Sequence, residues 1–298
     1  VEAVRPGEVD VRIELGGVLG SHKGINLPQS NIQAPALTEK DRDDLKVGVN
    51  AGVDFVALSF VRSRSDVVEL RDALTALGHS ELPIIAKIEK PEAVEHIDEI
   101  LTAVDGIMVA RGDLGVELPF EQVPVIQKQL IRAANKAGKL VITATQMLDS
   151  MERNPRPTRA ETTDVANAIL DGTDAVMLSG ETAAGQFPLE AVRVMNRIAQ
   201  HVESSPLFTY PSLDELPRKS TVDSTVLRAA SVAAREGGRP MVVFTWSGST
   251  AIRASKGRPK NGVFAITHDQ TIADRLSLAW GVNALRIPQI KGTDDLIS

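Results

Sequence analysis

The chain has 298 residues, 43% of them hydrophobic, and a formal net charge of −6 at pH 7. A chain of this length buries a sizeable core and forms more than one domain. The acidic balance argues against a general affinity for nucleic acid or acidic membrane surfaces, while small anions remain plausible ligands. Cysteine is absent, which excludes disulfides and thiolate metal sites. No apolar run approaches the roughly 20 residues of a membrane span and no secretion signal is visible, so we expect a cytoplasmic protein.

The first residues have a β pattern. Val9 to Leu15 alternate apolar and charged side chains, which predicts a half-exposed antiparallel strand after the Pro6-Gly7 turn. Glycines and two prolines follow, so we place a boundary near residue 34. Because the sequence opens on Val1 inside this pattern and stops at Ser298 without a clear end, we expect a fragment of a longer protein.

From residue 35 the pattern becomes alternating strand and helix, which predicts parallel strands with right-handed crossovers. Five apolar segments each run into residues suited to phosphate or metal chemistry. They are Asp54–Val61, Leu82–Glu89, Gly106–Asp113, Leu140–Met147 and Ala175–Thr182. Such residues at the C-terminal ends of successive strands are typical of an active site on the rim of a (β/α)8 barrel. A barrel needs eight strands, so residues 35–205 supply part of one.

A second α/β unit follows a stretch rich in proline, serine and charge from Ser204 to Lys219. We assign residues 206–298 to this linker and unit. Its predicted strands and helices are Met241–Thr245, Val263–Thr267 and Ala284–Ile287, with Ser224–Glu236 and Thr271–Gly281 between them. The small polar turn after Thr245 resembles a phosphate cradle, although many such turns use serine and glycine for geometry alone.

The sharpest chemical signal is at the second and third apolar segments. Lys87 and Glu89 are two residues apart on a predicted strand and therefore project to the same side. Glu89 and Asp113 end neighbouring segments, and two carboxylates with positions left for water and substrate suit Mg²⁺ or Mn²⁺. The structural alternatives are a rim salt bridge and, for Gly112-Asp113, a glycine turn with an aspartate cap.

The next two segments end in hydroxyl groups, at Thr143 to Thr145 and at Ser179. Hydroxyls at these places orient a carboxylate or relay a proton, or they only close a turn. Thr158 and Glu161 predict a helix capping box, so we do not assign Glu161 to catalysis. The convergence of several suitable groups at one end of successive strands favours an active site over independent structural explanations.

The residues now match a known pattern. Lys87-Ile88-Glu89, Met108 to Gly115, Ala144 to Met147, Arg156 to Glu161 and Leu178 to Thr182 resemble the pyruvate kinase family in type, order and spacing. The resemblance runs from Gly16-Gly17 to the end of the chain. It implies that residues 1–34 end an inserted β domain, residues 35–205 are strands four to eight of a TIM barrel, and residues 206–298 are a linker and part of a C-terminal regulatory α/β domain.

The resemblance also implies a glycolytic phosphotransferase that transfers a phosphoryl group from phosphoenolpyruvate to ADP, giving pyruvate and ATP. Lys87 would stabilise the phosphoryl group, and Glu89 and Asp113 would hold Mg²⁺ or Mn²⁺. Phosphoenolpyruvate would contact Gly112, Asp113 and Thr145, with Thr145 also near the enolate. Lys23 would contact a nucleotide phosphate. A phosphorylated allosteric effector would bind Thr245, Ser247, Gly248, Ser249 and Thr250.

This sequence departs from the family pattern at some positions and lacks some of the family's residues. Gln29 and His22 differ from the usual pattern near the hinge. The family's K⁺ ligands lie on early barrel strands that this sequence lacks, which leads us to expect that the piece is inactive alone. A homotetramer is the family's usual assembly, and sugar phosphates and AMP both stay open as effectors.

Two other functions compete with this reading. One is a metal-dependent carbon–carbon lyase of the pyruvate and phosphoenolpyruvate barrel group, which the Lys87–Glu89 pairing and Lys23 disfavour. The other is a non-catalytic homologue that binds a metabolite, against which the presence of Lys87, Glu89, Asp113 and Thr145 argues.

Overall fold

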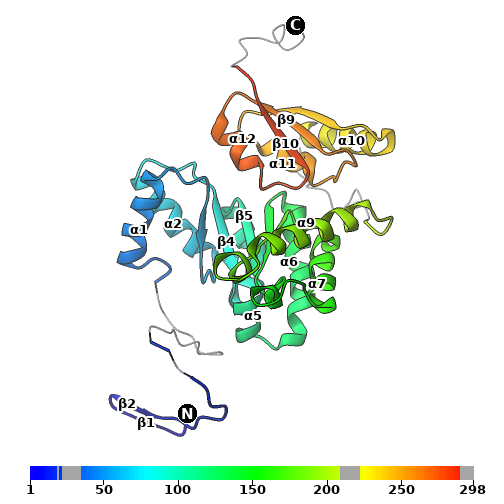
Figure 1. Cartoon of the computed structure of the whole chain (residues 1–298). Helices are drawn as coiled ribbons and strands as arrows, with labels where there is room; N and C mark the ends of the chain where they lie inside the picture. Colours follow the sequence, from blue (N-terminus) through cyan, green and yellow to red (C-terminus); the bar gives the residue numbers. More distant parts are fainter. Residues whose placement is uncertain (19, 22–34, 209–221, 289–298) are drawn as a thin grey trace.

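The computed structural model describes residues 1–18, 20–21, 35–208 and 222–288, with side chains left out at 222–224. Figure 1 shows three parts in chain order: an N-terminal hairpin, a unit around a five-stranded sheet, and a C-terminal unit around a three-stranded sheet. Both larger sheets are parallel. The expected α/β fold is therefore confirmed, while the domain limits at 34 and 205 stay predictions.

The N-terminal hairpin pairs β1 (Ala3–Arg5) with β2 (Glu8–Asp10) in antiparallel register, joined by a turn in which Gly7 has a φ of +80°. The predicted strand over Val9–Leu15 is wrong beyond Asp10. Its four apolar residues are between 56% and 92% exposed, so the alternation has no core against which to bury one face. Without such a face, the pattern does not specify strand pairing.

The central unit contains all five predicted parallel strands. They are β3 (Val56–Leu58), β4 (Ile84–Ile88), β5 (Gly106–Ala110), β6 (Leu140–Ala144) and β7 (Ala175–Val176). Their spatial order follows the sequence, β3-β4-β5-β6-β7. Within the described residues, β3 and β7 each pair on one side only, so these strands form an open segment of a sheet.

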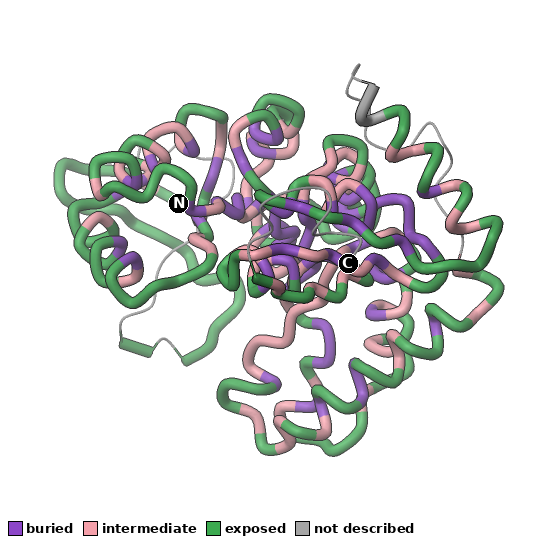
Figure 2. Tube along the Cα trace, turned by 90° about the horizontal axis from the view of Figure 1, so that it is seen from above, coloured by how far each residue is buried: buried purple, intermediate pink, exposed green. Residues whose placement is uncertain are grey.

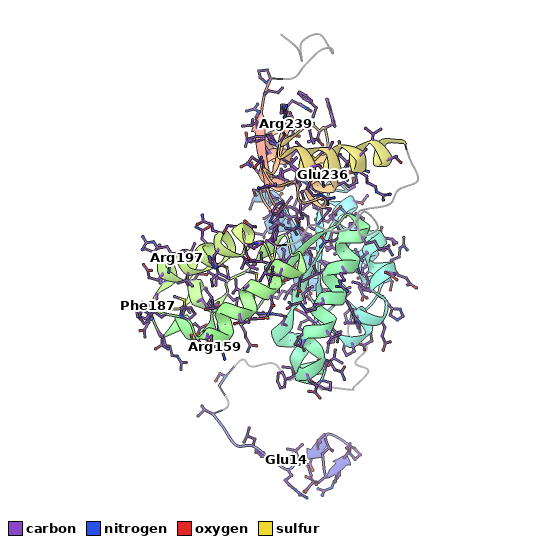
Figure 3. The ribbon with its side chains drawn as sticks, turned by 90° about the vertical axis from the view of Figure 1, so that its right-hand side faces the viewer. Glu14, Arg159, Phe187, Arg197, Glu236 and Arg239 are labelled. Carbon is purple, nitrogen blue, oxygen red and sulfur yellow. The ribbon has the colours of Figure 1, made fainter. Side chains whose placement is uncertain are left out.

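Helices connect these strands and cover the sheet (Figure 1). They are α1 (Glu39–Asn50), α2 (Arg64–Ala76), α3 (Pro91–Glu95), α4 (Ile97–Ala103), α5 (Arg111–Glu117), α6 (Val123–Ala137), α7 (Arg159–Asp171), α8 (Gly180–Ala183) and α9 (Pro188–Ser204). The helix expected after Pro91 is divided at His96, whose backbone leaves the helical region. Figure 3 shows Arg159, which begins α7, and Phe187, which precedes α9, on one outer side of this unit.

The core of the central unit lies between the sheet and its helices, and Figure 2 shows the buried residues gathered inside an exposed rim. Ile84, Ile88 and Ile107 are fully buried in it. Each such side chain contributes about 1.5–3 kcal/mol when removed from water. Gly106 has no room for a side chain, because a Cβ there would lie 2.7 Å from Ile85 Cδ1 and 2.9 Å from Leu140 Cβ. Glycine at this position lets three strands approach closely.

The C-terminal unit comprises α10 (Val222–Gly237), β8 (Met241–Phe244), α11 (Ser249–Ser255), β9 (Val263–Thr267), α12 (Gln270–Leu276) and β10 (Val282–Arg286). Its strands are ordered β10-β9-β8. The three predicted strands are present, but α12 ends at Leu276 and not at Gly281. None of the helices in the described part of the chain is long and apolar enough to cross a membrane.

A buried polar contact joins the two larger units. Lys256 Nζ forms an ion pair with Asp174, and the two side chains are 1% and 0% exposed. Arg258 Nη2 donates to the carbonyl oxygens of Gly172 and Thr173, and its guanidinium lies 4.5 Å from the Trp280 ring centroid. Burial lowers the pKa of Lys256, although the Asp174 carboxylate opposes that shift. The C-terminal unit is thus attached at the N-terminal end of β7, opposite the rim.

The predicted capping box at Thr158 is present, and Glu161 accepts hydrogen bonds from Thr158 N at 2.7 Å and from Ser150 N at 2.7 Å. Burial opposes ionisation of Glu161, but hydrogen bonds from Ser150 and Thr158 outweigh it, so its pKa lies below the ordinary value of 4.5. A lowered carboxyl pKa stabilises the fold above the unfolded-state pKa, and this contribution is lost as pH falls through the folded-state value.

We therefore expect Glu161→Gln to destabilise the protein by under about 1 kcal/mol at pH 7, the scale of a helix cap. The difference from wild type should shrink as pH falls below 4.5, because the unfolded chain is protonated first and the folded-state carboxylate follows as pH falls through its lowered pKa. Urea unfolding of both proteins between pH 7 and pH 3.5 measures this. A difference that stays constant over the whole range would contradict the assignment.

Candidate active site

The end of strand β4 carries the first part of the site. Its apolar residues are buried on both faces, and the chain continues into Lys87 and Glu89 at the rim. Lys87 Nζ lies 2.6 Å from Glu89 Oε1, and Glu89 is only 1% exposed. The sequence correctly placed the two groups together. The salt bridge that we considered as the alternative is present, and its carboxylate is buried.

Two residues at the end of β3 complete this corner, and sequence reasoning gave them no role. Ser59 Oγ accepts a hydrogen bond from Lys87 Nζ at 2.9 Å. Phe60 N donates to Glu89 Oε2 at 2.8 Å, and Phe60 has a φ of +55°, which is rare for a bulky residue. The left-handed backbone aims the amide at the carboxylate. Their position at the end of the first apolar segment is the signal that pointed to them.

The second part of the site lies where β5 passes into α5. Gly112 N donates to Thr145 Oγ1 at 2.7 Å, and Thr145 Oγ1 donates to Ala144 O at 2.6 Å. A Cβ on Gly112 would lie 3.4 Å from Thr145 Oγ1, so glycine allows this close approach. The structure therefore brings Gly112 and Thr145 together across two neighbouring strands. Helix α5 begins at Arg111, and the Gly112 amide in its first turn donates to Thr145.

The predicted metal ligands come from adjacent strands. β4 and β5 pair in parallel with Ile88 opposite Val109, which sets Glu89 and the first turn of α5, carrying Asp113, at the same end of the sheet. Among the described residues, no group of three or more His, Asp or Glu side chains forms a metal cluster. Two carboxylates fit a cation that keeps several water or substrate ligands, as Mg²⁺ does. Here Lys87 neutralises Glu89.

An open hollow lies next to the end of β3. A hollow of about 860 Å³ is bounded by α1 and β3, and Ser59, Phe60 and Lys90 line part of it. Lys90 Nζ pairs with Glu117 Oε1 at 2.6 Å and lies 5.9 Å from the Phe60 ring centroid. The hollow shares Ser59 and Phe60 with the end of β3, whereas Lys87 and Glu89 do not line it.

At the ends of β6 and β7, some polar residues belong to the candidate site and others only stabilise the fold. Thr143 is fully buried and its hydroxyl bonds to Thr173, so it belongs to the core. Glu181 is 2% exposed and accepts from Leu148 N at 3.0 Å and Ser179 N at 2.7 Å. These bonds make Glu181 a brace between the two rim loops. Of the hydroxyls considered in the sequence, Thr145 is the one placed beside Gly112.

The predicted effector loop follows β8. Thr245 Oγ1 accepts from Gly248 N at 3.0 Å, and Ser247 Oγ donates to Ser249 Oγ at 3.2 Å. Gly248 caps α11 with a φ of +81°. These bonds account for the loop's shape without a ligand, so the effector role of Thr245, Ser247, Gly248, Ser249 and Thr250 stays a prediction. Lys23, His22 and Gln29 lie outside the described residues.

Comparisons with known proteins cover nearly the whole chain. The family model described as pyruvate kinase, barrel domain, matches residues 1–192, and the one described as pyruvate kinase, alpha/beta domain, matches residues 223–298. Pyruvate kinase from Geobacillus stearothermophilus is 50% identical over 294 residues, which are 98% of this chain and 50% of that protein.

Two further relatives show the same extent of similarity. Pyruvate kinase from Clostridium acetobutylicum is 46% identical over 300 residues, 100% of this chain and 63% of that protein. Pyruvate kinase 2 from Synechocystis is 48% identical over 286 residues, 96% and 48% of the two chains. The chain spans about half to just under two thirds of the length of these relatives.

Proposed function

Because the chain belongs to the pyruvate kinase family, we propose that it carries the catalytic rim of a Mg²⁺-dependent phosphotransferase acting on phosphoenolpyruvate and ADP. The observation that carries this proposal is the contact between Lys87 and the buried Glu89 at the end of β4. A cation held against a buried carboxylate at a strand end is suited to phosphoryl transfer, which depends on positioning and on neutralising the charge of the transition state.

In the proposed reaction, the bond between phosphorus and the enol oxygen of phosphoenolpyruvate breaks. A bond forms between that phosphorus and a terminal oxygen of the ADP β-phosphate. The enolate left behind takes a proton at its methylene carbon and becomes pyruvate. Lys87 would offset negative charge on the phosphoryl group in flight, a role supported by the contacts of its ammonium with Ser59 and Glu89 at the rim.

Glu89 and Asp113 would hold Mg²⁺, which when bound supplies positive charge to the phosphate and carboxylate oxygens. Lys87, which lies against Glu89 Oε1 in this structure, would supply a second positive charge beside the cation. Thr145 and Gly112 would orient the substrate beside Asp113. The Thr145 hydroxyl donates its proton to Ala144 O, a bond that it would exchange for one to the ligand.

The nucleotide contact of Lys23, the K⁺ requirement, the homotetramer and the effector are proposals that rest on the family alone. The carbon–carbon lyase and the non-catalytic homologue gain no support from the geometry. The proposal is supported by two pairs at the same end of the sheet, Lys87 with Glu89 and Gly112 with Thr145. The direct test is ADP-dependent pyruvate formation from phosphoenolpyruvate by the full-length protein, with and without Mg²⁺ and K⁺. Absence of this activity under all four conditions would refute the proposal.

Replacing Glu89 by glutamine tests the metal site without relying on turnover. We expect Mn²⁺ affinity, measured by the paramagnetic signal of the free ion, to fall at least tenfold, because even outer-shell changes cost roughly 10–100-fold. Glu117→Gln is the matched control, since Glu117 is also buried and also pairs with a lysine at 2.6 Å. Equal Mn²⁺ affinity in wild type and Glu89→Gln would remove Glu89 from the metal site.

A further inference from the structure

Resting on the proposed function, we propose that Arg111 is a positioning residue that holds Thr145 in its substrate-facing conformation. Arg111 is the residue before Gly112, and its side chain is 10% exposed. It extends from the start of α5 to the end of β6. The residue therefore joins the two rim segments that are proposed to contact phosphoenolpyruvate.

All five N–H groups of the Arg111 guanidinium have acceptors. Nε donates to Ala144 O at 3.2 Å, and Nη2 donates to Thr145 O at 2.6 Å and to Met147 Sδ. Nη1 donates to Asp164 at 2.6 Å and to Gln127 at 3.4 Å. Two of these bonds hold the carbonyl groups of Ala144 and Thr145, which flank the φ torsion of Thr145. The guanidinium therefore restricts the backbone conformation of Thr145.

That backbone has an unusual conformation. Thr145 has a φ of +69° and Gln146 a φ of +52°, two successive residues in the left-handed region, which β-branched residues such as threonine rarely enter. Such a conformation persists only where surrounding contacts determine it. The contacts here are the Arg111 bonds to the Ala144 and Thr145 carbonyls and the bond from Gly112 N to Thr145 Oγ1.

The conformation places the Thr145 hydroxyl beside Gly112. If the turn relaxed to an ordinary extended backbone, the hydroxyl would leave the Gly112 amide and the rim. Lysine cannot replace Arg111 in this role, because a compact ammonium lacks the planar fork that spans two carbonyl groups. Asp164 on α7 pairs with the guanidinium from the opposite side. Arg111→Lys would therefore keep an ion pair with Asp164 but would not hold the left-handed backbone at Thr145.

The test is a double-mutant cycle of Arg111→Met and Thr145→Ala in the full-length protein. We expect Arg111→Met to lower kcat by about 10- to 100-fold, the scale of an ångström-sized misplacement. In the Thr145→Ala background the same change should lower kcat by no more than about twofold, since coupled residues are not additive. Mn²⁺ affinity should stay within about twofold of wild type, because Glu89 and Asp113 are unchanged.

Lys128→Met is the matched control, because Lys128 on α6 also pairs with an aspartate on α7, Asp171, and its side chain is 49% exposed. It should keep wild-type kcat. Arg111→Lys should lose as much as Arg111→Met, and it replaces Arg111→Met in the cycle if the methionine variant fails to fold.

Equal fold losses in the wild-type and Thr145→Ala backgrounds would overturn the positioning role, as would near-normal kcat in Arg111→Lys or a parallel loss of Mn²⁺ affinity. An inactive wild-type protein refutes the proposed function instead. An active wild type with additive losses refutes the Arg111 role alone.

Discussion

Lys87→Met in the full-length protein is expected to lower kcat by at least about 10²–10³-fold, the loss that follows removal of one stabilising donor from a water-excluded site. The reason is the position of Lys87 Nζ, 2.6 Å from Glu89 and 2.9 Å from Ser59 at the rim. Methionine has a similar length and no charge. Steady-state pyruvate formation at saturating Mg²⁺ measures the effect.

Metal binding separates this role from a general disturbance of the site. Without Lys87, the buried Glu89 carboxylate still accepts from Phe60 N, so Mn²⁺ affinity should be retained or increased. Lys90→Met is the control, because Lys90 forms an equally short pair with Glu117 and has no proposed role in the reaction. Near-normal turnover in Lys87→Met would exclude Lys87 from catalysis.

The strand ends of the rim were predictable because they depend on local periodicity. Side chains two apart share a face of a strand, so Lys87 and Glu89 had to lie together once β4 formed. Parallel pairing then carries Gly112 and Thr145 to the same end of the sheet. The same rule misled us at Val9–Leu15, where alternation exists but the described residues supply no core to cover its apolar face.

The backbone conformation of the rim was not predictable from the sequence. Phe60, Thr145 and Gln146 are left-handed, and nothing in a phenylalanine, threonine or glutamine suggests a positive φ. Their conformations come from contacts with Glu89, Gly112 and Arg111, residues on other elements. Arg111 lies in the motif from which we inferred a metal-binding role for Asp113, and sequence reasoning assigned no role to Arg111 itself. Its contacts with Ala144, Thr145 and Asp164 exist only in the folded structure.

The contact between the two units was hidden for a different reason. Lys256 and Arg258 lie in a run of basic and glycine residues, Lys256 to Lys260, which is ordinarily a solvated surface. In the structure Lys256 is 1% exposed and Arg258 is 4% exposed. Their burial depends on Asp174 and on the carbonyl groups of residues 172 and 173, more than 80 residues earlier in the chain.

Breaking this contact should destabilise the protein more than most single substitutions. Asp174→Ala leaves the Lys256 ammonium buried without its carboxylate and deprives Val141 N of an acceptor at 2.9 Å. We expect a loss of about 3–5 kcal/mol, the cost of removing one partner from a buried ion pair. Exposed pairs such as Arg42–Glu69 should contribute no more than about 1 kcal/mol, so Arg42→Met is the control.

Adding Lys256→Met to Asp174→Ala should recover part of that stability, because the uncompensated buried ammonium is then gone. The pKa of Lys256 is lowered, because burial and the nearby Arg258 cation together disfavour its charge more than Asp174 favours it. Urea unfolding followed by tryptophan fluorescence measures both variants, since Trp280 stacks on Arg258 and Phe208 and reports separation of the units. A double variant less stable than Asp174→Ala would show that Lys256 stabilises the contact through its packing and its bond to Asn135, and not through its pairing with Asp174.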